Sequence, residues 1–251
     1  LFNIHFKMKK PLVSIILTYY RKRKYIKKTI KSIKDQSYKN FQLICVYDDT
    51  DKTDLSYLKK LIATIKIKCL IVNKKNLGVA SSRNIATKHI KGKYTAFIDA
   101  DDLWKKDKIK KQLKYMQKSN SDISFSSYEI ISQSGKVNGI RVVPKNISYK
   151  VLSKKCDIGL SSVLIKSKIL KKNKFPKLKT QEDFGLWLKL IRKGYKFEPI
   201  DKIYMSWRND KNSLSSNTIQ KLLDAFKLFH EYENKNFILS FYSVLILSIN
   251  K

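Results

Sequence analysis

Hydrophobic residues in the first hundred positions form four short continuous runs, which is the pattern of strands buried on both faces. The runs cover residues 12–18, 41–47, 67–72 and 94–98. The segments between them repeat apolar side chains at helical spacing, and they cover residues 25–33, 55–65 and 79–90. The third of these helices is expected to stop at Gly92. Strands and helices that alternate in this way predict right-handed crossovers and a mostly parallel sheet.

After Trp104 the pattern changes. Two strand-like runs, 123–131 and 137–143, flank Gln133-Ser-Gly-Lys136 and predict a hairpin, so this part of the sheet is antiparallel or mixed. The remaining expected elements are a strand at 160–165 and helices at 107–117, 181–193 (ending at Gly194) and 219–229. We see no linker or repeat, so we expect one mixed α/β domain with a C-terminal helical appendage.

The longest apolar stretch, residues 237–249, has 13 residues and is interrupted by three serines. A spanning helix needs about 20 residues, so we expect this stretch to pack on the domain or to lie against a membrane or a partner. Residues 1–10 lack the apolar run of a secretory signal. We take Met8 as the expected start and regard the chain as a fragment or an extended reading frame.

The composition adds a strong positive charge to this picture. The chain has 251 residues, 54 of them Lys or Arg against 20 Asp or Glu, which gives a net charge of +34. Hydrophobic residues make up 43%, which excludes a disordered basic tail. Only six of the basic residues are Arg, and the Lys are spread along the whole chain, so solvated faces are favoured over a nucleic-acid site. Attraction to anionic lipid headgroups is a third interpretation.

Three cysteines, at positions 45, 69 and 156, have the spacing of neither a disulfide framework nor a zinc site. A reducing compartment is therefore the simpler expectation, and with no secretory signal it favours a cytoplasmic protein.

Acidic residues follow two of the predicted strands. Asp48 and Asp49 follow the second strand, and Asp99, Asp101 and Asp102 follow the fourth. Ligands of open parallel sheets bind outside the carboxyl ends of the strands. Carboxylates at close range repel, and Mg²⁺ or Mn²⁺ held by oxygen ligands would relieve the repulsion. Either acidic run alone is also typical of turns and caps, but two runs at neighbouring strand ends favour ligand binding.

Six segments, taken in order, resemble the family 2 glycosyltransferases with a GT-A fold. They are Val13-Ser-Ile-Ile-Leu-Thr18, Asp35-Gln-Ser-Tyr-Lys-Asn-Phe41, Val46-Tyr-Asp-Asp49, Asn76-Leu-Gly-Val-Ala-Ser-Ser-Arg-Asn-Ile-Ala86, Phe97-Ile-Asp-Ala-Asp-Asp-Leu-Trp104 and Glu182-Asp-Phe-Gly-Leu-Trp187. The resemblance covers about residues 11–215. It implies a single GT-A domain at 11–217, in which a Rossmann-like nucleotide-binding half (11–103) is fused to a mixed-sheet acceptor half (104–217). An N-terminal extension (1–10) and a C-terminal helical segment (218–251) complete the expected chain.

The resemblance also implies roles in donor binding. Thr18 and Asp49 would contact the nucleoside, with Asp48 beside them, and Arg83 would lie near the nucleotide. Asp99 and Asp101 match the DxD motif, in which Asp99 faces the ribose and Asp101 holds Mn²⁺ or Mg²⁺ on the diphosphate.

On the acceptor side, Asp183 matches the general base of the inverting members. Leu186, Trp187 and Leu190 follow it at helical spacing, so its carboxylate opens an apolar face where burial would raise its pKa. Without the resemblance, Glu182 and Asp183 would be taken as acidic residues that favour a helix N-terminus.

Asp102, Glu182 and Arg208 are expected as auxiliary residues. Arg208 belongs to a late segment, 207–215, that resembles the family's Tyr-Arg-x-His-x-x-Ser; this chain has Asp210 in place of the His. The segment 48–53 is two residues shorter than the usual form, so the nucleotide base is the least secure part of the expectation.

These features predict an inverting, metal-dependent glycosyltransferase. The favoured donor is a UDP-sugar, and the acceptor is the hydroxyl of a glycan or lipid-linked glycan, in cell-surface polysaccharide or lipooligosaccharide synthesis. Attachment to the inner face of the membrane is expected through the basic faces and residues 237–249. The alternative is a non-catalytic protein that binds nucleic acid or anionic surfaces on a similar scaffold; a nucleic-acid partner is disfavoured. A nucleotidylyltransferase is disfavoured because residues 18–23 contain no Gly.

Overall fold

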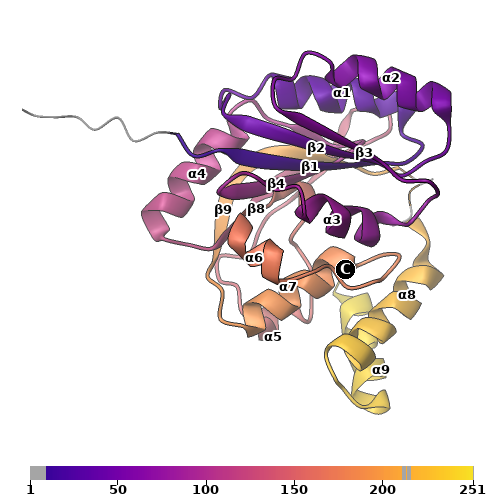
Figure 1. Cartoon of the computed structure of the whole chain (residues 1–251). Coiled ribbons are helices and arrows are strands. Elements are labelled where there is room, and N and C mark those ends of the chain that lie inside the picture. The colour runs from indigo at the N-terminus through magenta and orange to yellow at the C-terminus, as the bar shows by residue number, and fades with distance from the viewer. Residues whose placement is uncertain (1–9, 211–212, 214–215, 251) are drawn as a thin grey trace, which may run out of the picture.

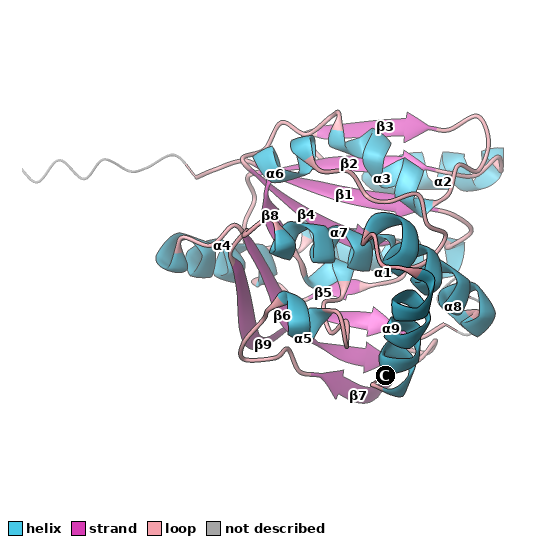
Figure 2. Cartoon of the chain, turned by 90° about the horizontal axis from the view of Figure 1, so that it is seen from below, coloured by secondary structure: helices cyan, strands magenta, loops and turns pink. Residues whose placement is uncertain are grey.

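The centre of the protein is a mixed β-sheet, seen in a computed structural model that describes residues 10–210, 213 and 216–250 (Figures 1 and 2). Within these residues the sheet has nine strands in the order β3-β2-β1-β4-β8-β6-β9-β5, and β7 pairs with β6. The strands are β1 (Val13–Tyr19), β2 (Phe41–Tyr47), β3 (Lys68–Val72), β4 (Tyr94–Asp99), β5 (Leu103–Trp104), β6 (Ile123–Ile131), β7 (Val137–Arg141), β8 (Leu164–Lys166) and β9 (Phe197–Arg208). Most of the predicted extension at residues 1–10 lies outside the described residues.

Strands β1 to β4 form the predicted parallel half of the sheet. β1 pairs in parallel with both β2 and β4, and β2 pairs in parallel with β3. In this register Thr18 lies opposite Val46 on one side and Asp99 on the other. The carboxyl ends of β2, β1 and β4 therefore meet at one edge of the sheet.

The second half of the sheet is mixed, as the sequence predicts. β8 pairs antiparallel with β4 and with the start of β6, and β6 and β7 form the expected hairpin. The long strand β9 runs parallel to β6 and antiparallel to β5. This pairing brings the end of β9, at Arg208, beside the segment that follows β4.

Helices cover both faces of the sheet (Figure 1). They are α1 (Arg23–Lys34), α2 (Lys52–Ile62), α3 (Val79–Thr87), α4 (Lys108–Ser119), α5 (Tyr149–Leu152), α6 (Ser167–Lys172), α7 (Glu182–Arg192), α8 (Thr218–Lys227) and α9 (Phe237–Ile249). The apolar sides of α1, α2 and α4 build one core. The other core contains residues of α3 and of α5 to α9, including the fully buried Trp187.

Some local expectations are wrong. The predicted strand at 160–165 is a 3₁₀ turn (Leu160–Ser162) followed by the short β8, and β9 was not predicted. The helix expected to stop at Gly92 ends at Thr87. Gly92 instead allows a close approach, because a Cβ there would lie 2.6 Å from the Ser14 amide nitrogen and 2.7 Å from the Leu12 oxygen.

Gly194, by contrast, does end a helix as predicted. It has φ +77° directly after α7, and the bonds from Gly194 N to Ile191 O and from Tyr195 N to Leu190 O close a Schellman motif. Among the described residues no helix has the length and apolar character needed to cross a membrane.

Candidate functional site

The predicted aspartates gather at the carboxyl edge of the parallel strands. Asp49 lies two residues beyond β2, Asp99 ends β4, and Thr18 lies between them near the end of β1. Neighbouring strands are about 4.8 Å apart, so the segments after β2 and β4 are separated only by the width of β1. The carboxyl edge is thus an acidic rim in a strongly basic protein.

Asp48 and Asp49 are adjacent in sequence but make different contacts. The Asp48 side chain is buried, and its Oδ1 accepts hydrogen bonds from Asn73 Nδ2 (2.7 Å) and Leu77 N (2.8 Å), while its Oδ2 accepts from Gly78 N (3.0 Å). These bonds fix the turn that leads into α3. Asp48 therefore shapes the wall of the site, and Asn73, which the sequence analysis did not single out, is its partner.

Asp49 lines a pocket of about 490 Å³. Its Oδ1 accepts from Thr50 N at 2.8 Å, and its Oδ2 lies 3.9 Å from Nε of the exposed Arg21. The other lining residues are Arg21, Arg23, Thr50, Asp51 and Asp54. Asp49 is thus the candidate carboxylate that opens into this cavity of the described structure.

Arg83 connects the DxD motif with α7. Its Nη2 donates to Asp99 Oδ1 at 2.7 Å, and its Nη1 donates to Glu182 Oε1. Burial alone would lower the pKa of Arg83, but the carboxylates of Asp99, Glu182 and Asp183 outweigh burial and raise it. A cation buried among three acids holds the end of β4 and the start of α7 together.

Asp183 is the second residue of α7 and lies next to this ion pair. Its Oδ1 accepts a hydrogen bond from Phe184 N at 2.8 Å. Burial raises its pKa, against the opposing effect of Arg83, which is the direction expected from the sequence. The same two influences act on Glu182, where burial also prevails and the pKa is raised to about 7. A carboxyl group with a raised pKa is suited to accept a proton near neutral pH.

Asp101 is paired with a cation of the chain itself. Lys22 Nζ lies 2.8 Å from Asp101 Oδ2 and 3.2 Å from Asp210 Oδ2. Burial lowers the pKa of Lys22, but the two carboxylates raise it by more, so the side chain is an ammonium at neutral pH. From the sequence, these acids are expected to need an added cation, and Lys22 is not among the expected site residues; its place among basic residues directly after the first strand was the available signal.

Asp102 and Arg208 are buried residues that support the DxD turn. Asp102 is 1% exposed, and its Oδ1 accepts from Arg208 N at 2.9 Å. Arg208 is also buried: its Nε donates to the backbone carbonyl of Asp101, its Nη1 donates to the backbone carbonyls of Ser132 and Gln133, and its guanidinium lies over the Tyr25 ring. Both residues thus fix the position of the DxD turn. Residues 211, 212, 214 and 215 of the late segment lie outside the described structure.

The carboxylates of this site fit a divalent ion whose remaining ligands come from the substrate. In the described part of the chain no three or more His, Cys, Asp or Glu form a cluster able to hold a metal alone. Mg²⁺ and similar ions are nevertheless often bound by one or two carboxylates plus substrate phosphates, and Asp99 and Asp101 supply such oxygens. Asp102 Oδ2 is buried without a hydrogen-bond partner in the described structure, and burial followed by the charges of Asp101 and Asp99 raises the pKa of Asp102 well above its ordinary value. Beside the two proposed metal ligands, the described structure thus leaves one buried carboxyl oxygen unsatisfied.

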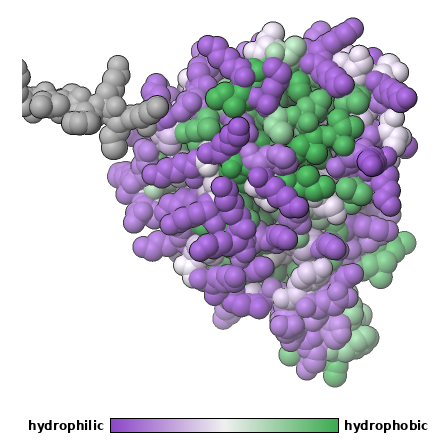
Figure 3. Space-filling model, in the orientation of Figure 1, coloured by the Kyte–Doolittle hydropathy of each residue, from purple (hydrophilic) through white to green (hydrophobic). Residues whose placement is uncertain are grey.

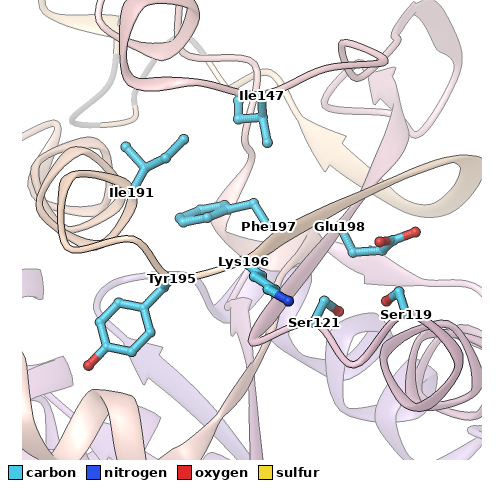
Figure 4. A pocket seen from close by; sticks show the side chains of 8 residues that line it. All are labelled: Ser119, Ser121, Ile147, Ile191, Tyr195, Lys196, Phe197 and Glu198. Carbon is cyan, nitrogen blue, oxygen red and sulfur yellow. The ribbon is translucent and has the colours of Figure 1, made fainter.

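A second cavity lies at the opposite end of the sheet. It has a volume of about 360 Å³ and opens near the beginnings of β6 and β9, between Ser121, Tyr195 and Phe197 (Figure 4). None of the candidate residues lines it, so it is separate from the acidic rim.

Comparison with known proteins agrees with this geometry. Residues 14–173 match the family model described as glycosyl transferase family 2. TuaG of Bacillus subtilis, whose name assigns it to teichuronic acid biosynthesis, is 33% identical over 91% of both chains. WfaP of Escherichia coli, named as a UDP-Glc:α-D-GlcNAc-diphosphoundecaprenol β-1,3-glucosyltransferase, is 33% identical over 84% of this chain and 83% of its own.

Solved structures show the same fold. The mannosyltransferase PcManGT of Pyrobaculum calidifontis, in complex with GDP-Man and Mn²⁺, superposes with a TM-score of 0.70 over 95% of this chain and 74% of its own, at 15% identity. The family match, the relatives and the shared fold together establish that this chain belongs to glycosyl transferase family 2 and is a glycosyltransferase with a GT-A fold.

Proposed function

We propose that the enzyme is an inverting, metal-dependent glycosyltransferase that moves a sugar from a UDP-linked donor to a hydroxyl of a glycan or lipid-linked glycan. The observation that carries this proposal is the gathering of Asp49, Asp99 and Asp101 at one sheet edge, with Asp183 beside the Arg83–Asp99 pair. The residues proposed to bind the donor nucleoside, the diphosphate and the acceptor would then lie side by side at one edge of the sheet.

On the donor side, Asp49 would hold the nucleoside in the pocket after β2, and Thr18 would contact it from the neighbouring end of β1. Asp99 would face the ribose, and Asp101 would be the carboxylate that holds Mn²⁺ or Mg²⁺. When bound there, such an ion neutralises negative charge that grows on the departing diphosphate. Arg83 adds a fixed positive charge at the same point, because buried ion pairs keep it in place before the reaction begins.

On the acceptor side, Asp183 would accept the proton of the attacking hydroxyl. Attack from the face opposite the leaving diphosphate inverts the configuration at the sugar carbon in one displacement. Glu182 would act through Arg83, since their ion pair positions the start of α7 against β4. We retain residues 11–103 as the donor half and 104–217 as the acceptor half.

The relatives guide the choice of substrates. WfaP is named for a UDP-glucose donor and an undecaprenol-linked acceptor, and TuaG for a cell-envelope polysaccharide. We therefore favour UDP-sugars and lipid-linked acceptors in cell-surface polysaccharide or lipooligosaccharide synthesis.

A donor panel tests the proposal. UDP-Glc, UDP-GlcNAc and GDP-Man would be offered with a GlcNAc-diphospholipid acceptor, in Mn²⁺ and in EDTA, and release of nucleoside diphosphate measured. We expect turnover of a UDP-sugar that stops in EDTA. Turnover that is undiminished in EDTA would contradict metal dependence, and a preference for GDP-Man would contradict the UDP assignment.

We also propose that α8 and α9 hold the enzyme on the inner face of an anionic membrane. Hydrophobic side chains reach the surface along these helices (Figure 3). Those more than half exposed include Ile219, Leu223, Phe237, Ile238, Phe241 and Tyr242. The 13 residues of α9 contain no charged side chain, while the chain as a whole carries +34, which favours a surface that is both apolar and negatively charged.

Vesicle flotation tests this attachment. We expect binding to phosphatidylglycerol vesicles, weaker binding to phosphatidylcholine vesicles, and loss of binding in Ile238→Asp/Phe241→Asp. Ile140→Asp, at an exposed apolar residue of β7, is the control. Equal binding of wild type and the double variant, or a stable dimer that covers this face, would overturn the proposal.

A further inference from the structure

Lys22 occupies a position between two largely buried carboxylates. Its ammonium lies 2.8 Å from Asp101 Oδ2 and 3.2 Å from Asp210 Oδ2, and the side chains of these acids are 13% and 8% exposed. The base of the side chain is fixed, since the Lys22 carbonyl accepts hydrogen bonds from the amides of Tyr25 and Ile26 at the start of α1. Lys22 is thus held against the carboxylate that we propose as the metal ligand.

We propose that Lys22 competes with the divalent metal for Asp101 and so makes metal binding depend on the nucleotide. The inference rests on the proposed role of Asp101 as metal ligand. It adds a residue that regulates access to that ligand.

Competition follows from charge and position. An ammonium at hydrogen-bond distance from Asp101 Oδ2 and a divalent cation bound to the same carboxylate would repel each other. Metal can therefore bind well only when Lys22 leaves Asp101. Asp210 gives the ammonium a second partner within reach, so the side chain can leave Asp101 without losing every ion pair.

The nucleotide favours that rearrangement. A diphosphate at the rim attracts the Lys22 ammonium and also offers the metal further oxygen ligands. Each ligand then improves the binding of the other, which is a reciprocal coupling between metal and nucleotide. Arg83 is unsuited to this movement, because its pairs with Asp99 and Glu182 leave its side chain 5% exposed, whereas that of Lys22 is 20% exposed.

Mn²⁺ titration followed by electron paramagnetic resonance tests the inference. In wild type we expect weak Mn²⁺ binding alone and binding at least about tenfold tighter with saturating UDP. Lys22→Met should bind Mn²⁺ alone at least about tenfold more tightly than wild type, and UDP should then add little. Lys22→Arg keeps the charge and should behave like wild type, as should Lys24→Met, which removes an exposed neighbouring charge.

Lys22→Gln provides a second neutral variant that keeps a hydrogen-bond donor for Asp101, in case Lys22→Met fails to fold. Unchanged Mn²⁺ affinity and unchanged coupling to UDP in the folded neutral variant would overturn this inference while leaving the proposed function intact. Failure of wild type to bind Mn²⁺ even with UDP would instead overturn the metal-dependent function itself.

Discussion

Substitution of Asp48 and of Asp49 tests the site sharply, because we expect the first to lower stability and the second to lower UDP affinity. Asp48 accepts three hydrogen bonds within the protein, two of them from backbone amides at Leu77 and Gly78. Asn at position 48 has one acceptor oxygen and one amide group, so the Gly78 amide would face a donor. The turn before α3 would lose the charged acceptor that fixes it.

The magnitude follows from these bonds. Hydrogen bonds to charged groups contribute about 1.5–3 kcal/mol each, and an unsatisfied buried donor adds a cost. We therefore expect Asp48→Asn to lower the free energy of unfolding by about 3 kcal/mol. For a protein of this size that corresponds to a fall in Tm of about 6–12 °C.

Asp49→Asn should have the opposite profile. Within the described structure, its carboxylate is paired with the neighbouring Thr50 amide and, at 3.9 Å, with an Arg21 side chain that is 74% exposed; so long an ion pair to a solvated partner adds little stability. We expect its Tm to stay within about 2 °C of wild type, while UDP affinity falls. Scanning calorimetry and UDP titration of both variants give the comparison. Equal destabilisation by the two substitutions, or a stable Asp48→Asn variant, would refute the reasoning.

Three further predictions use other parts of the structure. Asp183→Asn should lower kcat by about 10²–10⁴-fold with little change in UDP binding, because it removes only the base; unchanged kcat would exclude that role. Lys108 is fully buried in α4, and burial lowers its pKa well below 10.5. Burying a side chain that is charged in the unfolded chain therefore costs free energy at neutral pH, and this cost falls as pH rises towards 10.5, where the unfolded chain becomes neutral too. The stability of wild type relative to Lys108→Met should accordingly increase from pH 7 to 10 in urea titrations, and a pH-independent difference would contradict this. Gly92→Ala should lower Tm, since its Cβ would lie within 3 Å of three backbone atoms; an unchanged Tm would show that the strands can separate there.

The parallel half of the fold was predictable because each of its strands is a nearly unbroken apolar run. β9 was not, since it contains Glu198, Pro199, Asp201 and Lys202, and its pairing with β6 shifts register twice. Such a strand has neither a continuous run nor a regular alternation. The prediction of a strand at 160–165 failed for a related reason. The two serines of this segment favour a turn, in which the Ser162 hydroxyl donates to the backbone carbonyl of Gly159.

The acidic rim was predictable because aspartates are scarce and follow strands. The pairing of those aspartates was not. Lys22 is one of 48 lysines, and its partner Asp210 is 188 residues away in sequence. Likewise, nothing in the pair Asp48-Asp49 indicates which carboxylate binds the rest of the fold; that depends on the amides of a turn about thirty residues later, which bond to Asp48. The partners of these aspartates lie far away in the sequence, so local sequence patterns could not predict them.

Isothermal titration of UDP, with and without Mn²⁺, in wild type and in Asp101→Ala, tests most directly whether the acidic rim holds a metal and a nucleotide together. The proposed site predicts that Mn²⁺ strengthens UDP binding in wild type and that Asp101→Ala abolishes this gain. Equal UDP binding in all four titrations, or no binding in any of them, would contradict it.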